Sequence, residues 1–204
     1  MRTKNAMQLK ALIRNRAREE SVPAQLVMQN YLIERLLERI SRSSWRDVVV
    51  IKGGILISSL VGVSKRGTKD LDTTVQGVPL THENAERAFR EIVSVGVDDD
   101  FVFDFLRKED IREPDDYPGI RVHLLACYEE MRSPVTADVT TGDRITPGAI
   151  EYEYPLLFDK KAIPILTYPL VTVMAEKIET VISPDVGNTR PRDYYDLYML
   201  WKTR

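Results

Sequence analysis

The chain has 204 residues, 43% of them hydrophobic, and a formal net charge of −2 at pH 7. This composition indicates one large or two small packed domains, and no apolar run approaches the roughly 20 residues that span a membrane. The near-neutral charge requires any nucleic-acid binding to come from a local basic patch. The single cysteine, Cys127, excludes an internal disulfide and predicts a protein of the reducing cytoplasm.

The spacing of apolar residues is helical in the first third of the chain, interrupted by short strands. Helices are predicted over 5–20 and 24–40, followed by a buried strand over 48–51 and a short helix after the glycine pair that ends at residue 54. A second strand is predicted up to residue 75, and another helix over 81–93. Pro23 and Thr81 suit the starts of two of these helices.

From residue 101 the pattern is that of strands, predicted from 101, from 119 and over 135–140. A connector rich in Pro and Tyr is expected over 147–169, followed by helices over 170–182 and 191–201. The sequence therefore predicts an α+β (mixed) fold. We expect N-terminal helices plus a core in residues 1–150 and a C-terminal helical part, packed on that core, in residues 151–204.

Asp70 and Asp72 stand one residue apart in the second predicted strand. Alternate side chains of a strand point to one face, so the two carboxylates should project together. They repel each other unless a cation lies between them, and magnesium prefers carboxylate oxygens. Asp138, a charge within an otherwise apolar strand pattern, is the expected third ligand. Turn capping or a solvated edge strand would explain such acids without a metal.

Gly53 and Gly54 come before the first turn of a predicted helix, where backbone amides favour phosphate. A phosphate cradle beside a metal site is the layout of a nucleotidyltransferase, in which the metal polarises the attacking hydroxyl and neutralises the leaving pyrophosphate. Lys177 shares an apolar helical stripe with Val173 and Val181. Its amine either contacts a triphosphate or reaches the surface.

The last predicted helix is preceded and opened by four charged residues, Arg190, Arg192, Asp193 and Asp196. The helix dipole favours Asp193 in the first turn, and Arg192 and Asp196 are spaced to pair along the helix. Capping explains much of this segment. Alternatively, these side chains orient Lys177 or a nucleotide.

Seven stretches together resemble the AbiEii/AbiGii toxin family of nucleotidyltransferases, which includes toxins of type IV toxin–antitoxin systems and the MenT toxins. They are spread over nearly the whole chain, at 31–40, 51–54, 66–72, 119–122, 137–143, 175–179 and 188–197. The resemblance implies a DNA-polymerase-β-like nucleotidyltransferase core, magnesium (Mg²⁺), and a nucleoside triphosphate (NTP) as donor. A departure is Gly53-Gly54, where many nucleotidyltransferases have Gly-Ser and therefore a hydroxyl contact to phosphate.

The resemblance implies roles for Asp70, Asp72, Lys177, Arg192, Asp193 and Asp196, and the sequence pattern adds the remaining candidates. The expected catalytic residues are Asp70, Asp72, Lys177, Asp193 and Asp196. The expected nucleotide-binding residues are Gly53, Gly54, Arg66, Thr68, Lys177, Arg192 and Asp193. The expected metal ligands are Asp70, Asp72 and Asp138.

Family members studied as toxins add nucleotides to tRNA acceptor ends, so the resemblance implies a tRNA acceptor and a cognate antitoxin. Basic residues of the first two helices are candidate tRNA contacts, namely Arg14, Arg16, Arg18, Arg35, Arg39, Arg42 and Arg46. Interleaved glutamates favour a solvated face instead, and the acidic tract 98–100 is expected to be a solvated loop. The alternatives are a transferase acting on a small molecule or a protein hydroxyl, and a catalytically silent nucleotide-binding or partner-binding protein.

Overall fold

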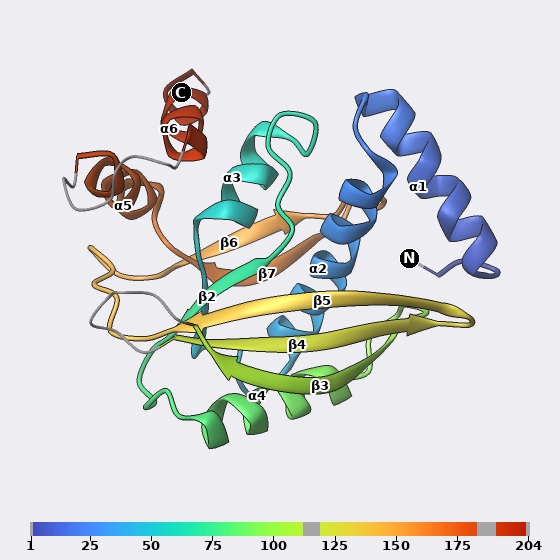
Figure 1. Ribbon diagram of the computed structural model, residues 1–204, viewed down its shortest axis with the longest axis horizontal. Coiled ribbons are helices and arrows are strands. Elements are labelled where there is room, and N and C mark those ends of the chain that lie inside the picture. The colour runs from blue at the N-terminus through green and yellow to red at the C-terminus, as the bar shows by residue number, and fades with distance from the viewer. Residues whose placement is uncertain (1, 112–118, 183–190, 203–204) are drawn as a thin grey trace.

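A computed structural model describes residues 2–111, 119–182 and 191–202 (Figure 1). The described residues form one seven-stranded sheet with the strand order β3-β4-β5-β2-β1-β7-β6. The helices are α1 (Ala6–Glu20), α2 (Ala24–Arg42), α3 (Gly53–Val61), α4 (His82–Ser94), α5 (Leu170–Ile182) and α6 (Pro191–Lys202). The strands are β1 (Val49–Ile51), β2 (Leu71–Val75), β3 (Val102–Asp110), β4 (Gly119–Tyr128), β5 (Met131–Thr140), β6 (Ile150–Pro155) and β7 (Ala162–Thr167).

Helices pack on both faces of the sheet, because the short central strand β1 is apolar on both sides. Val49 and Ile51 join the larger core, which α2 and α4 cover and on which α1 packs through α2 (Figure 1). Val50 points the other way and belongs to a smaller core with residues of α3, α5 and α6. The mixed α+β fold with N-terminal and C-terminal helices is therefore confirmed.

The strand register places two of the predicted acids side by side. β2 is antiparallel to β1 and parallel to β5, and Asp72 is directly opposite Asp138. In the sequence, β3 and β4 lie between β2 and β5. They form an antiparallel meander with β5, which brings β5 back beside β2. The register thus brings both carboxylates side by side in the middle of the sheet.

The connector expected over 147–169 is wrong, because this segment contains β6 and β7. These strands pair antiparallel with each other, and β7 adds to β1 in parallel through Ile51 and Thr167. Proline and tyrosine are compatible with strands at a sheet edge, and β6 is the edge strand here. The division into residues 1–150 and 151–204 stays a prediction, although two strands of the second part complete the sheet of the first.

α2 carries a buried ionic network that ties it to two distant loops. The Arg39 guanidinium donates to both carboxylate oxygens of Asp99, at 2.6 and 2.9 Å, and to the Phe101 carbonyl at 2.7 Å. Glu34 accepts from Arg35 at 2.6 Å and from the backbone amide of Leu157 at 2.5 Å. Such charges are tolerated inside a protein because each has a partner.

This network corrects two expectations from the sequence. Arg35 and Arg39 are 1% and 3% exposed, so they cannot contact an RNA from the folded protein. The Asp99 side chain is only 1% exposed, which is contrary to the solvated loop expected over 98–100. Helical periodicity did not predict the burial of Arg39, because its acidic partner Asp99 comes from a distant loop. Arg35 is buried although its partners, Glu34 and Glu38, lie on its own helix.

In the described residues, no helix is long and apolar enough to cross a membrane.

Replacing Arg39 with methionine should lower the free energy of unfolding by about 3–5 kcal/mol, because Asp99 would remain buried without its cation. Arg14→Met is the matched control, since Arg14 is exposed on α1 and its loss should change stability by about 0.5 kcal/mol or less. Denaturant unfolding followed by circular dichroism measures both variants. Equal effects of the two substitutions would contradict the structural role of Arg39.

Candidate functional site

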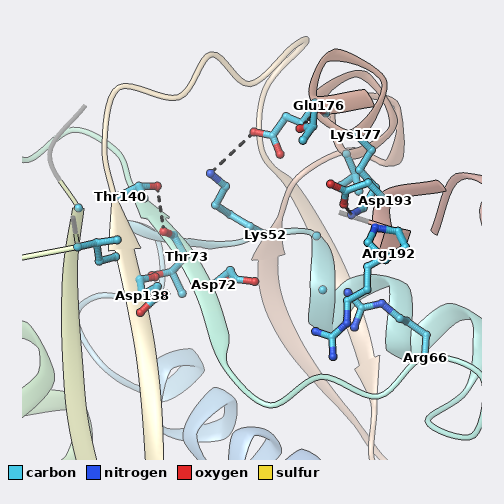
Figure 2. A pocket seen from close by; sticks show the side chains of 17 residues that line it. Lys52, Arg66, Asp72, Thr73, Asp138, Thr140, Glu176, Lys177, Arg192 and Asp193 are labelled. Carbon is cyan, nitrogen blue, oxygen red and sulfur yellow. Dashed lines mark hydrogen bonds and ion pairs between the residues drawn. The ribbon is translucent and has the colours of Figure 1, made fainter. Parts of the chain in front are cut away.

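A cavity of about 650 Å³ lies beside β2 and β5, and α5 and α6 form its opposite wall (Figure 2). Its lining contains eight of the residues predicted from the sequence, namely Gly53, Gly54, Arg66, Asp72, Asp138, Lys177, Arg192 and Asp193. Asp70, Thr68 and Asp196 lie next to the cavity without lining it. The fold therefore brings together side chains from segments more than a hundred residues apart.

Asp72 is the acid at the centre of the cavity wall, and it has an unfavourable environment. Burial, followed by the negative charges of Asp138 and Asp70, raises its pKa to about 6, although Lys52 and Arg66 act in the opposite direction. A cation placed at this carboxylate would relieve the repulsion. The oxygen donors of Asp72 and Asp70 have the chemistry that a hard divalent cation such as Mg²⁺ prefers.

The three predicted metal ligands are neighbours but do not converge. Asp70 is exposed and lies one residue before β2. Both oxygens of Asp138 accept hydrogen bonds from Arg121, each at 2.7 Å. Among the described residues, no three acidic, histidine or cysteine side chains are close enough together to enclose a metal ion. Asp72 with Asp70 is therefore the best-supported part of the predicted metal site.

The glycine pair forms the first turn of α3 rather than a separate turn before the helix. Neither glycine has a positive φ angle, so the need for Gly54 is spatial. A Cβ atom there would lie 3.2 Å from the hydroxyl of Thr68 and 3.5 Å from a carboxylate oxygen of Asp72. Lys52, the residue that caps α3, makes no side-chain capping bond, which leaves the first amides of this helix available to an anion at the cavity.

α2 holds the loop that leads into β2. Asn30 donates its side-chain amide to the Thr68 carbonyl at 3.0 Å, and Gln29 donates to the Lys69 carbonyl at 3.1 Å. The Thr68 hydroxyl in turn donates to the Asp70 carbonyl at 3.2 Å. Thr68 is buried, and its contacts support the shape of the loop.

The opposite wall is organised around Asp196, whose side chain is completely buried. Its carboxylate accepts from Arg66 Nε at 2.7 Å and forms an ion pair with Lys177 Nζ at 2.7 Å. Lys177 also donates to Asp193 at 2.8 Å. The predicted pair of Arg192 and Asp196 along the helix is wrong, because in the described part of the chain Asp196 binds cations from the α3–β2 loop and α5. Arg190 lies outside the described residues.

Three charged residues of the site were missed by the sequence reasoning. Lys52 forms ion pairs with Asp143 at 3.1 Å and with Glu176 at 3.8 Å. Burial alone would raise the pKa of Asp143, but Lys52 and the hydroxyls of Thr140 and Thr74 lower it overall. Burial raises the pKa of Glu176. The stretch Ile51-Lys-Gly-Gly was the signal that could have identified Lys52, since it places a lysine directly before the glycines.

Comparisons with known proteins show the family and the fold of the chain. The family model described as "Nucleotidyl transferase AbiEii toxin, Type IV TA system" matches residues 35–204. A comparison with curated proteins finds no similar sequence.

Two solved structures show the same fold at low sequence identity. JHP933 from Helicobacter pylori is similar with a TM-score of 0.57 and 13% identity, over 87% of this chain and 66% of that chain. Another H. pylori protein, described as a candidate nucleotidyltransferase, is similar with a TM-score of 0.53 and 14% identity, over 89% of this chain and 70% of that chain. The chain thus spans about two thirds of each of these proteins.

Asp72→Asn should stabilise the metal-free protein above pH 6 by up to about 3 kcal/mol, which is the free energy of a shift from 3.8 to about 6. Because the folded-state pKa is raised, the stabilising effect of the protonated carboxyl is complete below pH 4 and is lost as the pH rises through 6. The difference between variant and wild type should therefore vanish near pH 4. Thermal unfolding in a chelator at several pH values measures this difference in stability, with exposed Asp47→Asn as the control. A difference that did not change with pH would disprove the raised pKa of Asp72.

Asp196→Asn should cost about 3–5 kcal/mol of stability, because a buried carboxylate between two cations is neutralised. Asp193→Asn should cost about 1 kcal/mol, since Lys177 keeps its bond to Asp196. Urea unfolding of the two variants makes the comparison. A larger loss for Asp193→Asn would contradict the central position of Asp196.

Proposed function

The chain belongs to the AbiEii family of nucleotidyltransferase toxins of type IV toxin–antitoxin systems, and from this we propose that it transfers a nucleotide from an NTP to tRNA in a Mg²⁺-dependent reaction. The observation that carries the proposal is the polarity of the cavity. A half-buried carboxylate, Asp72, lies on the sheet side, and the cations Arg66, Lys177 and Arg192 lie on the other (Figure 2). A triphosphate with a bound metal ion fits this division, with the metal ion on the side of Asp72 and the phosphates on the side of the cations.

Asp72 and Asp70 would hold the metal ion, which, when bound, activates the attacking hydroxyl and neutralises charge on the phosphates. The raised pKa of Asp72 supports this role, because its ionised form is unfavourable without a counter-charge. Asp138 is proposed to join them when Arg121 releases one of its oxygens. No covalent intermediate with the protein is required, since positioning and charge neutralisation are sufficient for in-line attack on the α-phosphorus.

The cations are proposed to bind the phosphates. Arg192 lines the cavity and has no ion-pair partner among the described residues, so its charge is available to an anion. Lys177 and Arg66 are held in place by Asp196, which reduces the entropy lost when a nucleotide binds. The free amides at the start of α3 would replace the hydroxyl of the Gly-Ser pair found in many nucleotidyltransferases.

The acceptor is proposed from the family resemblance together with the charges that remain exposed. Of the candidate tRNA contacts, Arg14, Arg18, Arg42 and Arg46 are exposed, and of these Arg42 pairs with Glu38 and Arg46 with Asp47. Arg16 pairs with Glu20 on its own helix. A cognate antitoxin is the proposed protein partner. The other acceptors to test are a small molecule and a protein hydroxyl, and a catalytically silent nucleotide-binding protein is the third reading.

Incubation of the protein with each α-labelled NTP, total tRNA and Mg²⁺ should label tRNA, and a chelator should abolish the labelling. Asp72→Ala should lower the rate about 100-fold or more, because charge at the reacting phosphorus would no longer be neutralised. Exposed Asp47→Ala is the matched control. Label on protein or on a metabolite instead would favour the other transferases, and no label with any NTP would favour the silent protein.

The same variants test toxicity in cells. Expression of the wild type should arrest growth, and Asp72→Ala should relieve the arrest while the protein remains folded. Arrest that persists with a stable, fully expressed Asp72→Ala protein would contradict the mechanism.

A further inference from the structure

Lys52 is held in place at the cavity, unlike a lysine that extends freely into solvent. It lies between β1 and α3, and its backbone N–H donates to the Asp72 carbonyl at 2.9 Å. Its side chain passes the ring of buried Tyr168, with the amine 5.4 Å from the ring centroid, and only 18% of it is exposed. The backbone that carries the central acid of the cavity therefore also positions this amine.

The amine of Lys52 points into the cavity from the side of the glycine pair, between the acids of the sheet and the cations of α5 and α6 (Figure 2). Its two partners differ in strength. Asp143 is fixed by the hydroxyl of Thr140 at 2.8 Å and lies 3.1 Å from the amine. Glu176 is 3.8 Å away and its side chain is 39% exposed, so this second pair is weak.

Two other cations of the cavity, Arg66 and Lys177, are engaged more firmly than Lys52. Arg66 and Lys177 share the buried carboxylate of Asp196 at 2.7 Å each. Lys52 therefore has the most easily exchanged acidic partner of these three cations. A polyanion entering the cavity would compete with Glu176 and not with a buried carboxylate.

Building on the proposed function, we propose that Lys52 binds the triphosphate of the donor nucleotide, releasing Glu176 while Asp143 keeps the amine in place. The phosphate chain would then lie between Lys52 on the side of β1 and Lys177 on α5, with Asp72 facing it. Lys52 would thus provide, next to the helix α3 amides, a positive charge that the Gly-Gly pair itself lacks. The opposing hypothesis is that Lys52 only neutralises Asp143.

Binding of nonhydrolysable triphosphate analogues distinguishes these roles without depending on turnover. The α,β-methylene analogues of ATP, GTP, CTP and UTP are titrated with Mg²⁺ by calorimetry, and the tightest is compared with its nucleoside monophosphate. Lys52→Gln should weaken the binding of the triphosphate analogue about tenfold or more, which is the effect of one lost charge-assisted hydrogen bond. It should change the binding of the monophosphate far less. Lys65→Gln, which removes an exposed lysine from the following loop, should change neither.

A double-mutant cycle separates phosphate binding from neutralisation of Asp143. Glu176→Gln should tighten the binding of the triphosphate analogue about threefold or more, because Lys52 no longer has to be released from Glu176. This gain should disappear in the Lys52→Gln background. Thermal unfolding verifies that all variants are folded.

Normal triphosphate binding by folded Lys52→Gln would overturn the assignment, and so would an equal gain from Glu176→Gln in both backgrounds. If the wild type bound none of the four analogues, the proposed function would fail together with the role of Lys52. A failure of Lys52 alone is recognised by tight binding to the wild type that the variant retains.

Discussion

A carboxylate in a half-buried position without its own counter-ion is the constraint on which the cavity depends. Asp72 lies beside Asp138 because β2 and β5 run parallel in register, and this proximity, together with burial, raises its pKa. A folded protein keeps an ionised carboxylate in such an unfavourable environment only where the surrounding structure enforces it, and these places are often functional. The surrounding cations Lys52 and Arg66 reduce the penalty but do not contact the carboxylate.

The cation side of the cavity depends on a second acid with the opposite environment. Asp196 is fully buried yet satisfied, since it binds Arg66 from the α3–β2 loop and Lys177 from α5. One carboxylate therefore fixes two cations from distant segments and attaches α6 to the rest of the molecule. The two acids of the last helix consequently differ, because Asp193 lines the cavity whereas Asp196 supports it from behind.

Much of the fold could be predicted from the sequence because its signals are local. Helices α1, α2, α4, α5 and α6 follow from apolar periodicity, and Thr81 caps α4 as expected, accepting from the Asn84 amide. The strands β6 and β7 could not be predicted in the same way. Their residues resemble a connector, and they join the sheet only because β7 pairs with β1 and β6 pairs with β7.

The sequence by itself determined which residue types are available for chemistry: the Asp70 and Asp72 pair, the glycine pair that opens α3, and a lysine and two acids near the end of the chain. Only the tertiary structure decided which of them meet. Arg39 is inside the protein because Asp99 approaches it, and Lys52 belongs to the cavity because Asp143 and Glu176 fold over it. The physical reason is that a charge takes its role from its burial and its partners, and those partners come from segments that no local spacing connects.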